Sequence, residues 1–190
     1  PPFLLVHDDG NNQDTLQARV NGYLQLNQSK YPAQAIHRID YETSGLVLFC
    51  KHPFFQAYCD KNMEEHHIKK EYIALVQGHT NYKNKKIISN IARDRHNAKK
   101  MIIHPNGKES VSIFNTLKNY KDCSLIQVTI LTGRKHQIRV QCASLNHPIL
   151  NDSLYGGKKI DNTGLLLQSH HIQFNDVDIT CPQEKRFIRK

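Results

Sequence analysis

Short apolar runs, each bounded by glycine, proline or polar residues, constrain the fold of this 190-residue chain more than any other feature. Runs of about four to eight residues that are rich in β-branched or aromatic side chains are typical of strands. The sequence predicts strands at 46–49, 72–76, 111–117, 124–131, 165–167 and 172–179. A chain of this length is large enough for one domain with its own core. We therefore expect a β-sheet to form most of that core.

Helices are predicted singly between these strands. Asp14 is the expected N-cap of a first helix, and Pro53 suits the first turn of a second. A third helix is predicted at 134–145, ended by Asn146 in the left-handed conformation. Residues 80–108 are polar and are expected to be irregular. Because no repeat or linker is visible, the sequence predicts one α+β domain, 1–190, in which strands dominate.

The charge and the cysteines limit the class of partner and the compartment. A formal net charge of +9 favours a polyanionic partner, either nucleic acid or an anionic membrane. No apolar run is long enough to span a bilayer and no signal peptide is visible, so we expect no membrane association. The five cysteines are odd in number and form no CxxC pair, which argues against a disulfide framework and a zinc ribbon. Free thiols in a reducing cytoplasm are the expected state.

A lone carboxylate, Asp40, lies in a charged segment that leads into a Thr-Ser-Gly turn at 43–45 and then into the apolar run at 46–49. Loops that are held by rigid structure are common positions for catalytic groups. An isolated loop aspartate is more often simply exposed to solvent. The function of Asp40 therefore depends on what the other segments contain.

Other segments also carry groups suited to chemistry. Lys70-Glu71-Tyr72 brings a tyrosine to the start of a strand, although a packing role explains a tyrosine there equally well. The junction at 132–139 combines a glycine with arginines, whose planar guanidinium groups suit carboxylates and phosphates. Positive charges in the first turn of the helix predicted at 134–145 oppose its dipole. This argues against an ordinary solvent-exposed helix start at this position. The loop at 147–156, bounded by proline and glycine, is uninformative by itself.

Taken in order, these segments resemble the RluA family of RNA pseudouridine synthases. The resemblance is carried by His37-Arg38-Ile39-Asp40 with 43–45, by Lys70-Glu71-Tyr72, by 132–140 and by 147–156, and it runs from near Pro1 to about Gly156. It implies the pseudouridine synthase fold, a mixed and largely antiparallel sheet with flanking helices and a central RNA-binding cleft. It also implies an isomerase that detaches uracil from its ribose, rotates it and rejoins it through carbon 5, without a cofactor or a metal.

The resemblance further assigns roles to individual residues. Asp40 matches the catalytic aspartate, Tyr72 the tyrosine that stacks on the flipped uracil, and Arg134 the basic residue that pairs with the aspartate. Arg38 matches the arginine that enters the helix stack in place of the expelled base. Flipping a base costs roughly a few kcal/mol, and stacking on an aromatic face returns about 1–3 kcal/mol. An arginine partner favours the charged carboxylate, so we expect Arg134 to keep Asp40 ionised.

Basic residues elsewhere are expected to contact RNA phosphates. The predicted contacts are Lys83, Lys85, Lys86, Arg93, Arg95, Lys99 and Lys100 in the polar stretch, together with His136 and Arg139 at the junction. Each phosphate that is neutralised should steepen the salt dependence of RNA binding by roughly 0.7 to 0.9 log units. An ordinary solvated loop is the alternative for the polar stretch.

The chain departs from the family pattern at a few positions. Gln141 stands where the family usually has histidine, and Asn146 and Asn151 stand where it has glycine. Asparagine tolerates the left-handed conformation, so these turns should survive, and Gln141 should alter packing or a secondary hydrogen bond. Pro1-Pro2 resembles the end of the family's first short motif. We therefore expect the chain to begin inside the domain, without the N-terminal S4 domain that some members carry.

Alternatives from other functional classes stay open. An RNA-binding module with the same fold would need no turnover, although the presence of Asp40, Tyr72 and Arg134 argues against it. The twelve histidines, with pairs at 66–67 and 170–171, favour a metallo-hydrolase, but no HxH or HExxH spacing occurs. Ribosomal and transfer RNA are both possible substrates, and a monomer is expected.

Overall fold

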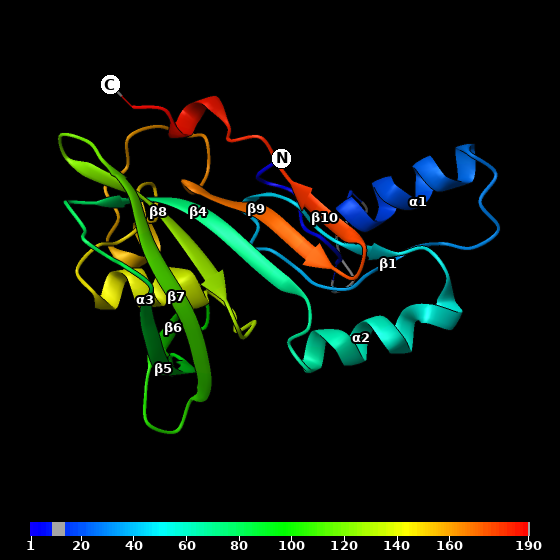
Figure 1. Ribbon diagram of the computed structural model, residues 1–190, viewed down its shortest axis with the longest axis horizontal. Coiled ribbons are helices and arrows are strands. Elements are labelled where there is room, and N and C mark those ends of the chain that lie inside the picture. The colour runs from blue at the N-terminus through cyan, green and yellow to red at the C-terminus, as the bar shows by residue number, and fades with distance from the viewer. Residues whose placement is uncertain (9–13, 190) are drawn as a thin grey trace.

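One large sheet forms the body of the molecule, and helices lie at its margins and on one face (Figure 1). The computed structural model describes residues 1–8 and 14–189. Within this part of the chain, the strand order is β10-β9-β4-β8-β7-β5-β6 through antiparallel pairs, and β2 joins β9 in parallel. The strands are β2 Ser44–Gly45, β4 Lys69–Gln77, β5 Lys85–Arg93, β6 Met101–Ile103, β7 Lys108–Asn119, β8 Cys123–Ile130, β9 Leu167–Phe174 and β10 Val177–Thr180. A smaller sheet pairs β1 Gln34–Ala35 with β3 Phe49–Cys50. The predicted α+β fold with a mixed, largely antiparallel sheet is confirmed.

The helices match the predicted positions, with different ends. They are α1 Leu16–Leu26, α2 Gln56–Glu64 and α3 Gln137–Ser144, with short 3₁₀ turns η1 Pro53–Phe55, η2 Ser153–Tyr155 and η3 Lys185–Phe187. The predicted cap of the first helix is wrong. Thr15 Oγ1 accepts the hydrogen bond from Ala18 N at 3.1 Å, whereas Asp14 pairs with Arg19 at 2.7 Å. Asn146 has a φ of 62°, in the left-handed conformation as predicted.

The stretch 80–108 forms β5 and β6, so the prediction of irregular structure is wrong. Ile91 of β5 is buried, but the lysines of this strand are exposed, which gives it the composition of a loop. β5 pairs with β7 from Lys85 opposite Phe114 to Ile91 opposite Lys108. Pairing with a neighbouring strand therefore supplies the stability that the local composition does not indicate.

The predicted strand at 46–49 is also wrong in its bounds. Strand pairing occurs on either side of this run, between β2 and β9 and between β1 and β3. Leu46 and Leu48 lie between the two pairings and pack against a small cluster that contains Ile172 and Phe174. The run is apolar because it covers this cluster, not because it forms a strand.

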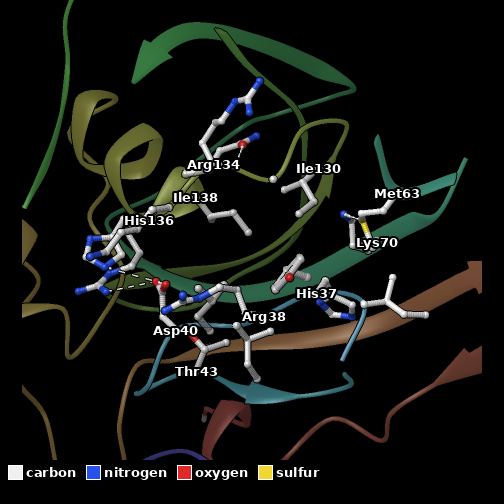
Figure 2. Close-up of a pocket in the computed structure, with 18 of the residues that line it drawn as sticks. His37, Arg38, Asp40, Thr43, Met63, Lys70, Ile130, Arg134, His136 and Ile138 are labelled. Carbon is white, nitrogen blue, oxygen red and sulfur yellow. Dashed lines mark hydrogen bonds and ion pairs between the residues drawn. The ribbon is translucent and has the colours of Figure 1, made fainter. Parts of the chain in front are cut away.

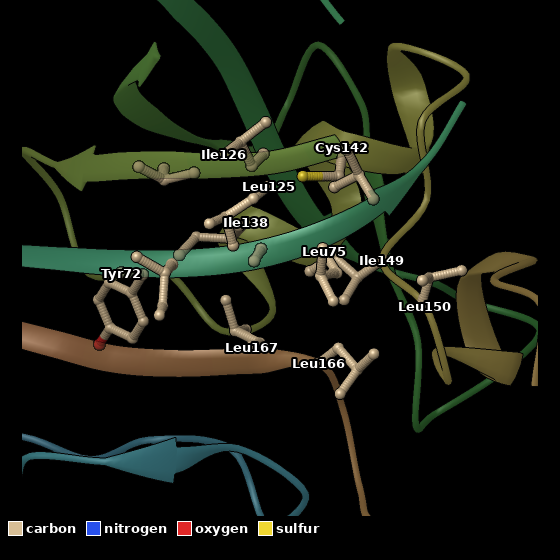
Figure 3. Close-up of a cluster of buried hydrophobic side chains, with 14 of the residues drawn as sticks. Tyr72, Leu75, Leu125, Ile126, Ile138, Cys142, Ile149, Leu150, Leu166 and Leu167 are labelled. Atoms are coloured by element: carbon tan, nitrogen blue, oxygen red, sulfur yellow. The ribbon is translucent and has the colours of Figure 1, made fainter. Parts of the chain in front are cut away.

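The main core lies where α3 and the segment before β9 pack against β4 and β8 (Figure 3). Leu75 and Ile126 are completely buried in it, and α3 contributes Ile138 and Cys142. This packing holds the start of α3 against β4. It therefore places the junction 132–139 beside Tyr72.

All five cysteines are free thiols and four of them are buried, as expected from their spacing. Among the described residues, no helix combines the length and the apolar character that crossing a membrane requires. In the same part of the chain, no group of three or more His, Cys, Asp or Glu side chains is arranged to hold a metal ion.

Gly45 allows the loop 36–43 to approach the sheet closely. Its φ is 110°, and a Cβ at this position would lie 2.1 Å from the carbonyl oxygen of Ser169. Gly45→Ala is therefore expected to lower the free energy of unfolding by roughly 1–3 kcal/mol, measured by urea denaturation. Gly22→Ala is the matched control, because nothing lies within 4 Å of the added methyl group in α1. This control should stabilise the protein by about 0.5–1 kcal/mol. If both variants lose the same free energy of unfolding, the close contact between Gly45 and Ser169 is not the cause.

Candidate active site

A cavity of about 640 Å³ opens beside β4, between the loop 36–43, the end of α2 and the junction 133–139 (Figure 2). Its volume lies in the range of roughly 300–1,000 Å³ that is typical of small-molecule sites. Of the residues singled out in the sequence, those that line it are Arg38, Asp40, Tyr72, Arg134, His136 and Arg139. The fold thus brings motifs that are distant in the chain to one site.

Asp40 lies at one end of the cavity, on a tight turn. A hydrogen bond of 2.9 Å from Thr43 N to the carbonyl oxygen of Asp40 closes this turn. The Asp40 side chain is 24% exposed, and its Oδ2 accepts a hydrogen bond from Arg139 Nη1 at 3.2 Å. The carboxylate is therefore held in place and still open to the cavity.

A second carboxylate fixes Arg139 itself. Arg139 Nε and Nη2 donate to Asp152 Oδ2 and Oδ1 at 2.8 and 2.9 Å, in a bidentate pair. The side chain of Asp152 is 0% exposed and that of Arg139 is 5% exposed. Burial opposes the charged form, but the hydrogen bond with Asp152 raises the pKa of Arg139. Arg139 is therefore a cation of fixed orientation that faces Asp40.

The predicted pairing of Arg134 with Asp40 is wrong. Arg134 lines the cavity but is exposed, and its Nε donates to the carbonyl oxygen of Glu109 at 3.0 Å. Arg139 takes the place beside Asp40 because it lies within α3 on the buried face, whereas Arg134 precedes the helix. Contact between Arg139 and RNA phosphates stays a prediction, although Asp40 and Asp152 already hold its guanidinium group.

His136 borders Asp40 at the start of α3. Its Nε2 lies 3.9 Å from Asp40 Oδ1, and its Nδ1 lies 2.9 Å from the hydroxyl of Tyr155. The backbone of His136 has a φ of 55°, a strained conformation for a residue other than glycine and one that is concentrated at functional sites. Burial lowers the pKa of His136 to about 4, so its ring is neutral at pH 7. It offers a neutral hydrogen-bonding group at the cavity wall.

Tyr72 contributes to the wall of the cavity from β4. It is 6% exposed, and burial raises its pKa to about 12, so the phenol stays neutral. Tyr72 lies opposite Ser169 in the pairing of β4 with β9. The ring therefore provides a rigid aromatic surface, while Arg38 lies exposed at the rim of the same cavity.

The basic residues of the polar stretch lie outside the cavity lining. Lys83 precedes β5; Lys85, Lys86 and Arg93 lie on β5; and Arg95, Lys99 and Lys100 lie between β5 and β6. Lys100 Nζ is 5.6 Å from the ring centroid of Tyr155, the same tyrosine that contacts His136. We call these seven lysine and arginine residues the basic margin. The basic margin contacts Tyr155 and so lies next to the site, and its contact with RNA stays a prediction.

The site also contains residues outside the predicted set, namely Asp152, Tyr155 and Lys70. Asp152 and Tyr155 lie in the loop 147–156, which was matched as a motif without a role for any residue. The apolar Ile149 and Leu150 just before Asp152 were the available sign that this carboxylate is buried. Lys70 lies in a motif from which only the tyrosine was selected.

The departures from the family pattern behave as expected. Asn151 has a φ of 69°, so its turn survives as that of Asn146 does. Gln141 is completely buried, and its Nε2 donates to Ser89 Oγ at 3.1 Å. The substitution at Gln141 therefore affects packing and a hydrogen bond to β5, away from Asp40.

His37 and His136 make the folded protein sensitive to acid. Burial lowers the pKa of each to about 4 from an ordinary value of 6.5. The unfolded chain takes up these protons first, so stability is lost as the pH falls from about 6.5 to about 4. His37→Asn should reduce the loss between pH 7 and pH 4.5 by on the order of 2 kcal/mol, measured by urea denaturation at both pH values.

His96→Asn is the matched control for this effect, because His96 is exposed in the turn before β6. Its loss of stability at pH 4.5 should equal that of the wild type. If His37→Asn loses as much stability between pH 7 and pH 4.5 as the wild type, His37 is not a cause of the acid sensitivity.

Comparisons with known proteins agree on one family. Residues 1–144 match the family model described as RNA pseudouridylate synthase. The chain is 36% identical over 160 residues to the uncharacterized RNA pseudouridine synthase YhcT of Bacillus subtilis, which covers 83% of this chain and 53% of the relative. It is 40% identical over 128 residues to ribosomal large subunit pseudouridine synthase C of Buchnera aphidicola, which covers 66% of this chain and 41% of the relative. The chain spans about half the length of the curated relatives it matches.

Solved structures show the same fold. Human RNA pseudouridylate synthase domain containing 4 superimposes with a TM-score of 0.80 at 18% identity, over 98% of this chain and 84% of that one. Human RNA pseudouridylate synthase domain containing 1 gives a TM-score of 0.78 at 24% identity, over 93% of this chain and 77% of that one. At these identities the likeness establishes the fold alone.

Proposed function

The chain belongs to the RNA pseudouridylate synthase family, and on this premise we propose that it isomerises specific uridines in structured RNA to pseudouridine. This agrees with the family resemblance noted in the sequence. Relatives at 40% and 32% identity are named ribosomal large subunit pseudouridine synthases, which makes ribosomal RNA the first candidate substrate. Transfer RNA is the second.

The arrangement of Asp40, Arg139 and Asp152 carries this proposal. Asp40 faces the cavity, Arg139 neutralises and orients it, and Asp152 prevents Arg139 from turning away. A carboxylate held in this way beside an aromatic wall is a preorganised catalytic group. We propose Asp40 as the catalytic residue and Tyr72 as the surface on which uracil stacks.

The reaction requires no cofactor because its atoms balance within the nucleoside. The bond between N1 and the ribose breaks, a bond between carbon 5 and the ribose forms, carbon 5 loses a proton and N1 gains one. An ionised carboxylate is suited to attack or to proton abstraction during this exchange. Arg139 orients the Asp40 carboxylate for this exchange through the hydrogen bond from its Nη1.

The uridine must leave its stack before Asp40 can reach it. We propose that Arg38, exposed at the rim of the cavity, fills the vacated space, and that stacking on Tyr72 offsets part of the cost of flipping. The basic margin formed by Lys83, Lys85, Lys86, Arg93, Arg95, Lys99 and Lys100 would contact phosphates farther along the RNA.

We further propose that residues 1–190 form the catalytic domain, that it acts as a monomer, and that it works in the cytoplasm. Free cysteines support a reducing compartment. A monomer leaves the cavity and the basic margin open to a large RNA.

Pseudouridine mapping in total RNA tests the proposed function. Cells that lack the gene are supplied with the wild type, with Asp40→Asn, or with Asp176→Asn, which removes an exposed carboxylate between β9 and β10. Sites restored by the wild type and by Asp176→Asn, and not by Asp40→Asn, would establish the reaction, the substrate and the role of Asp40. If no protein restores any site, an RNA-binding module without turnover becomes the better explanation.

A further inference from the structure

Lys70 is a buried cation that the proposed chemistry does not use. It is 7% exposed and lies on β4, two residues before Tyr72 and on the same face of the strand. It lines the same cavity as Asp40. Figure 2 shows Lys70 beside Met63, well away from the Asp40 end.

In the part of the chain that the structure describes, no carboxylate lies within ion-pair distance of Lys70. Its Nζ lies 2.9 Å from Met63 Sδ, and a thioether is a weak acceptor. The adjacent residue Lys69 is different, because it points to the other face of the strand and pairs with Glu71 at 3.0 Å. Burial lowers the pKa of Lys70 to about 8, so the amine is still largely protonated at pH 7. A buried ammonium without a counter-charge destabilises the free protein and is a candidate for ligand binding.

Lys70 is placed to bind a part of the nucleotide other than the base that stacks on Tyr72. A strand rises about 3.3 Å per residue, so Lys70 is displaced along β4 from Tyr72 by about 7 Å. In RNA, the base is joined through one ribose to the phosphates on either side. The cavity, at about 640 Å³, extends past Tyr72 to Lys70, and Arg134 and Lys135 add positive charge to its wall.

We propose that Lys70 binds a backbone phosphate of the substrate RNA next to the uridine that stacks on Tyr72. This inference rests on the proposed function and adds a subsite to it. A phosphate satisfies the buried charge, whereas the neutral oxygens of uracil would leave it uncompensated. Lysine is a common phosphate ligand.

The test compares the binding of uridine, uridine 3′-monophosphate and uridine 5′-monophosphate to the full 190-residue chain at pH 7, by titration calorimetry. The wild type should bind at least one monophosphate about tenfold more tightly than uridine, because a hydrogen bond to a charged group is stronger than a neutral one. Lys70→Met should bind all three ligands equally. Lys69→Met, the matched control on the opposite face, should keep the preference of the wild type, and Lys70→Arg should keep part of it.

Lys70→Met removes a buried charge and should melt no lower than the wild type, which shows that it is folded. The proposal is overturned if this variant keeps the preference, because the phosphate would then lie on other cations such as Arg134. It is equally overturned if the variant loses uridine itself, or if the wild type shows no preference. If the protein forms pseudouridine but gives any of these results, only the proposed phosphate subsite is wrong. If the mapping experiment fails, the proposed function itself is wrong.

Discussion

Asp40→Asn is expected to lower the rate of pseudouridine formation by at least about a thousandfold while the protein stays folded. The amide keeps the shape of the side chain but cannot act as a base or as a nucleophile. The fold should persist because Arg139 keeps its bidentate pair with Asp152. The measurement is the single-turnover rate on the RNA that pseudouridine mapping identifies, together with a thermal melt.

Glu42→Gln is the matched control for this prediction. Glu42 lies two residues after Asp40 and is 42% exposed, and its Oε2 lies 4.0 Å from Arg139 Nη2. Its loss should change the rate by less than about threefold, because an exposed pair at this distance contributes little. A rate for Asp40→Asn within tenfold of the wild type would exclude Asp40 as the catalytic residue.

Arg139→Met is expected to lower the free energy of unfolding by about 3–5 kcal/mol. The variant leaves the carboxylate of Asp152, which is 0% exposed, without its cation. Urea denaturation at pH 7 measures the loss. Arg134→Met should change stability by less than about 1 kcal/mol, because the Arg134 side chain is exposed and, among the described residues, bonds only the carbonyl oxygen of Glu109.

A double variant separates the charge of this pair from its packing. Arg139→Met combined with Asp152→Asn removes both buried charges with little change in volume. It should recover most of the stability that Arg139→Met loses, while pseudouridine formation stays low because Asp40 has no cation. If the double variant is as unstable as Arg139→Met, packing of the guanidinium against Tyr155, 5.1 Å from its ring centroid, explains the loss instead.

The sequence predicted the parts of the fold that local pattern determines. The apolar runs in β4, β7 and β8 indicated strands, whereas the strands predicted at 165–167 and 172–179 overlap only the ends of β9 and run into β10. Pro53 and Asn146 marked the start of one helical segment and the end of another, although Asp14 is not the cap of the first helix. The motif around Asp40 and the tyrosine of β4 led to residues that line one cavity. These features are recognisable because each depends on residues that are close together in the chain.

The errors concern features that depend on distant residues. β5 is a strand because β7 pairs with it, and the lysines of β5 give this segment a composition that does not indicate a strand. The choice between Arg134 and Arg139 depends on which arginine faces the buried Asp152, thirteen residues beyond Arg139. Burial of Lys70 likewise depends on how α2 and the junction 133–139 close over β4. Such information is present in the three-dimensional packing and not in the spacing of residues.

The parallel pair between β2 and β9 has a consequence for the order in which the molecule is made. Ser44 and Gly45 are held by Gln168 and Ser169, more than a hundred residues later in synthesis. Synthesis runs from the N-terminus at roughly 5–20 residues per second, so β2, which follows the Asp40 loop, has no partner strand until the chain has been made as far as Ser169. A nascent chain without β9 therefore carries Asp40, Arg139 and Asp152 but lacks the strand that holds the Asp40 loop in place. The site therefore assembles only when β9 has been made and has paired with β2 and β4.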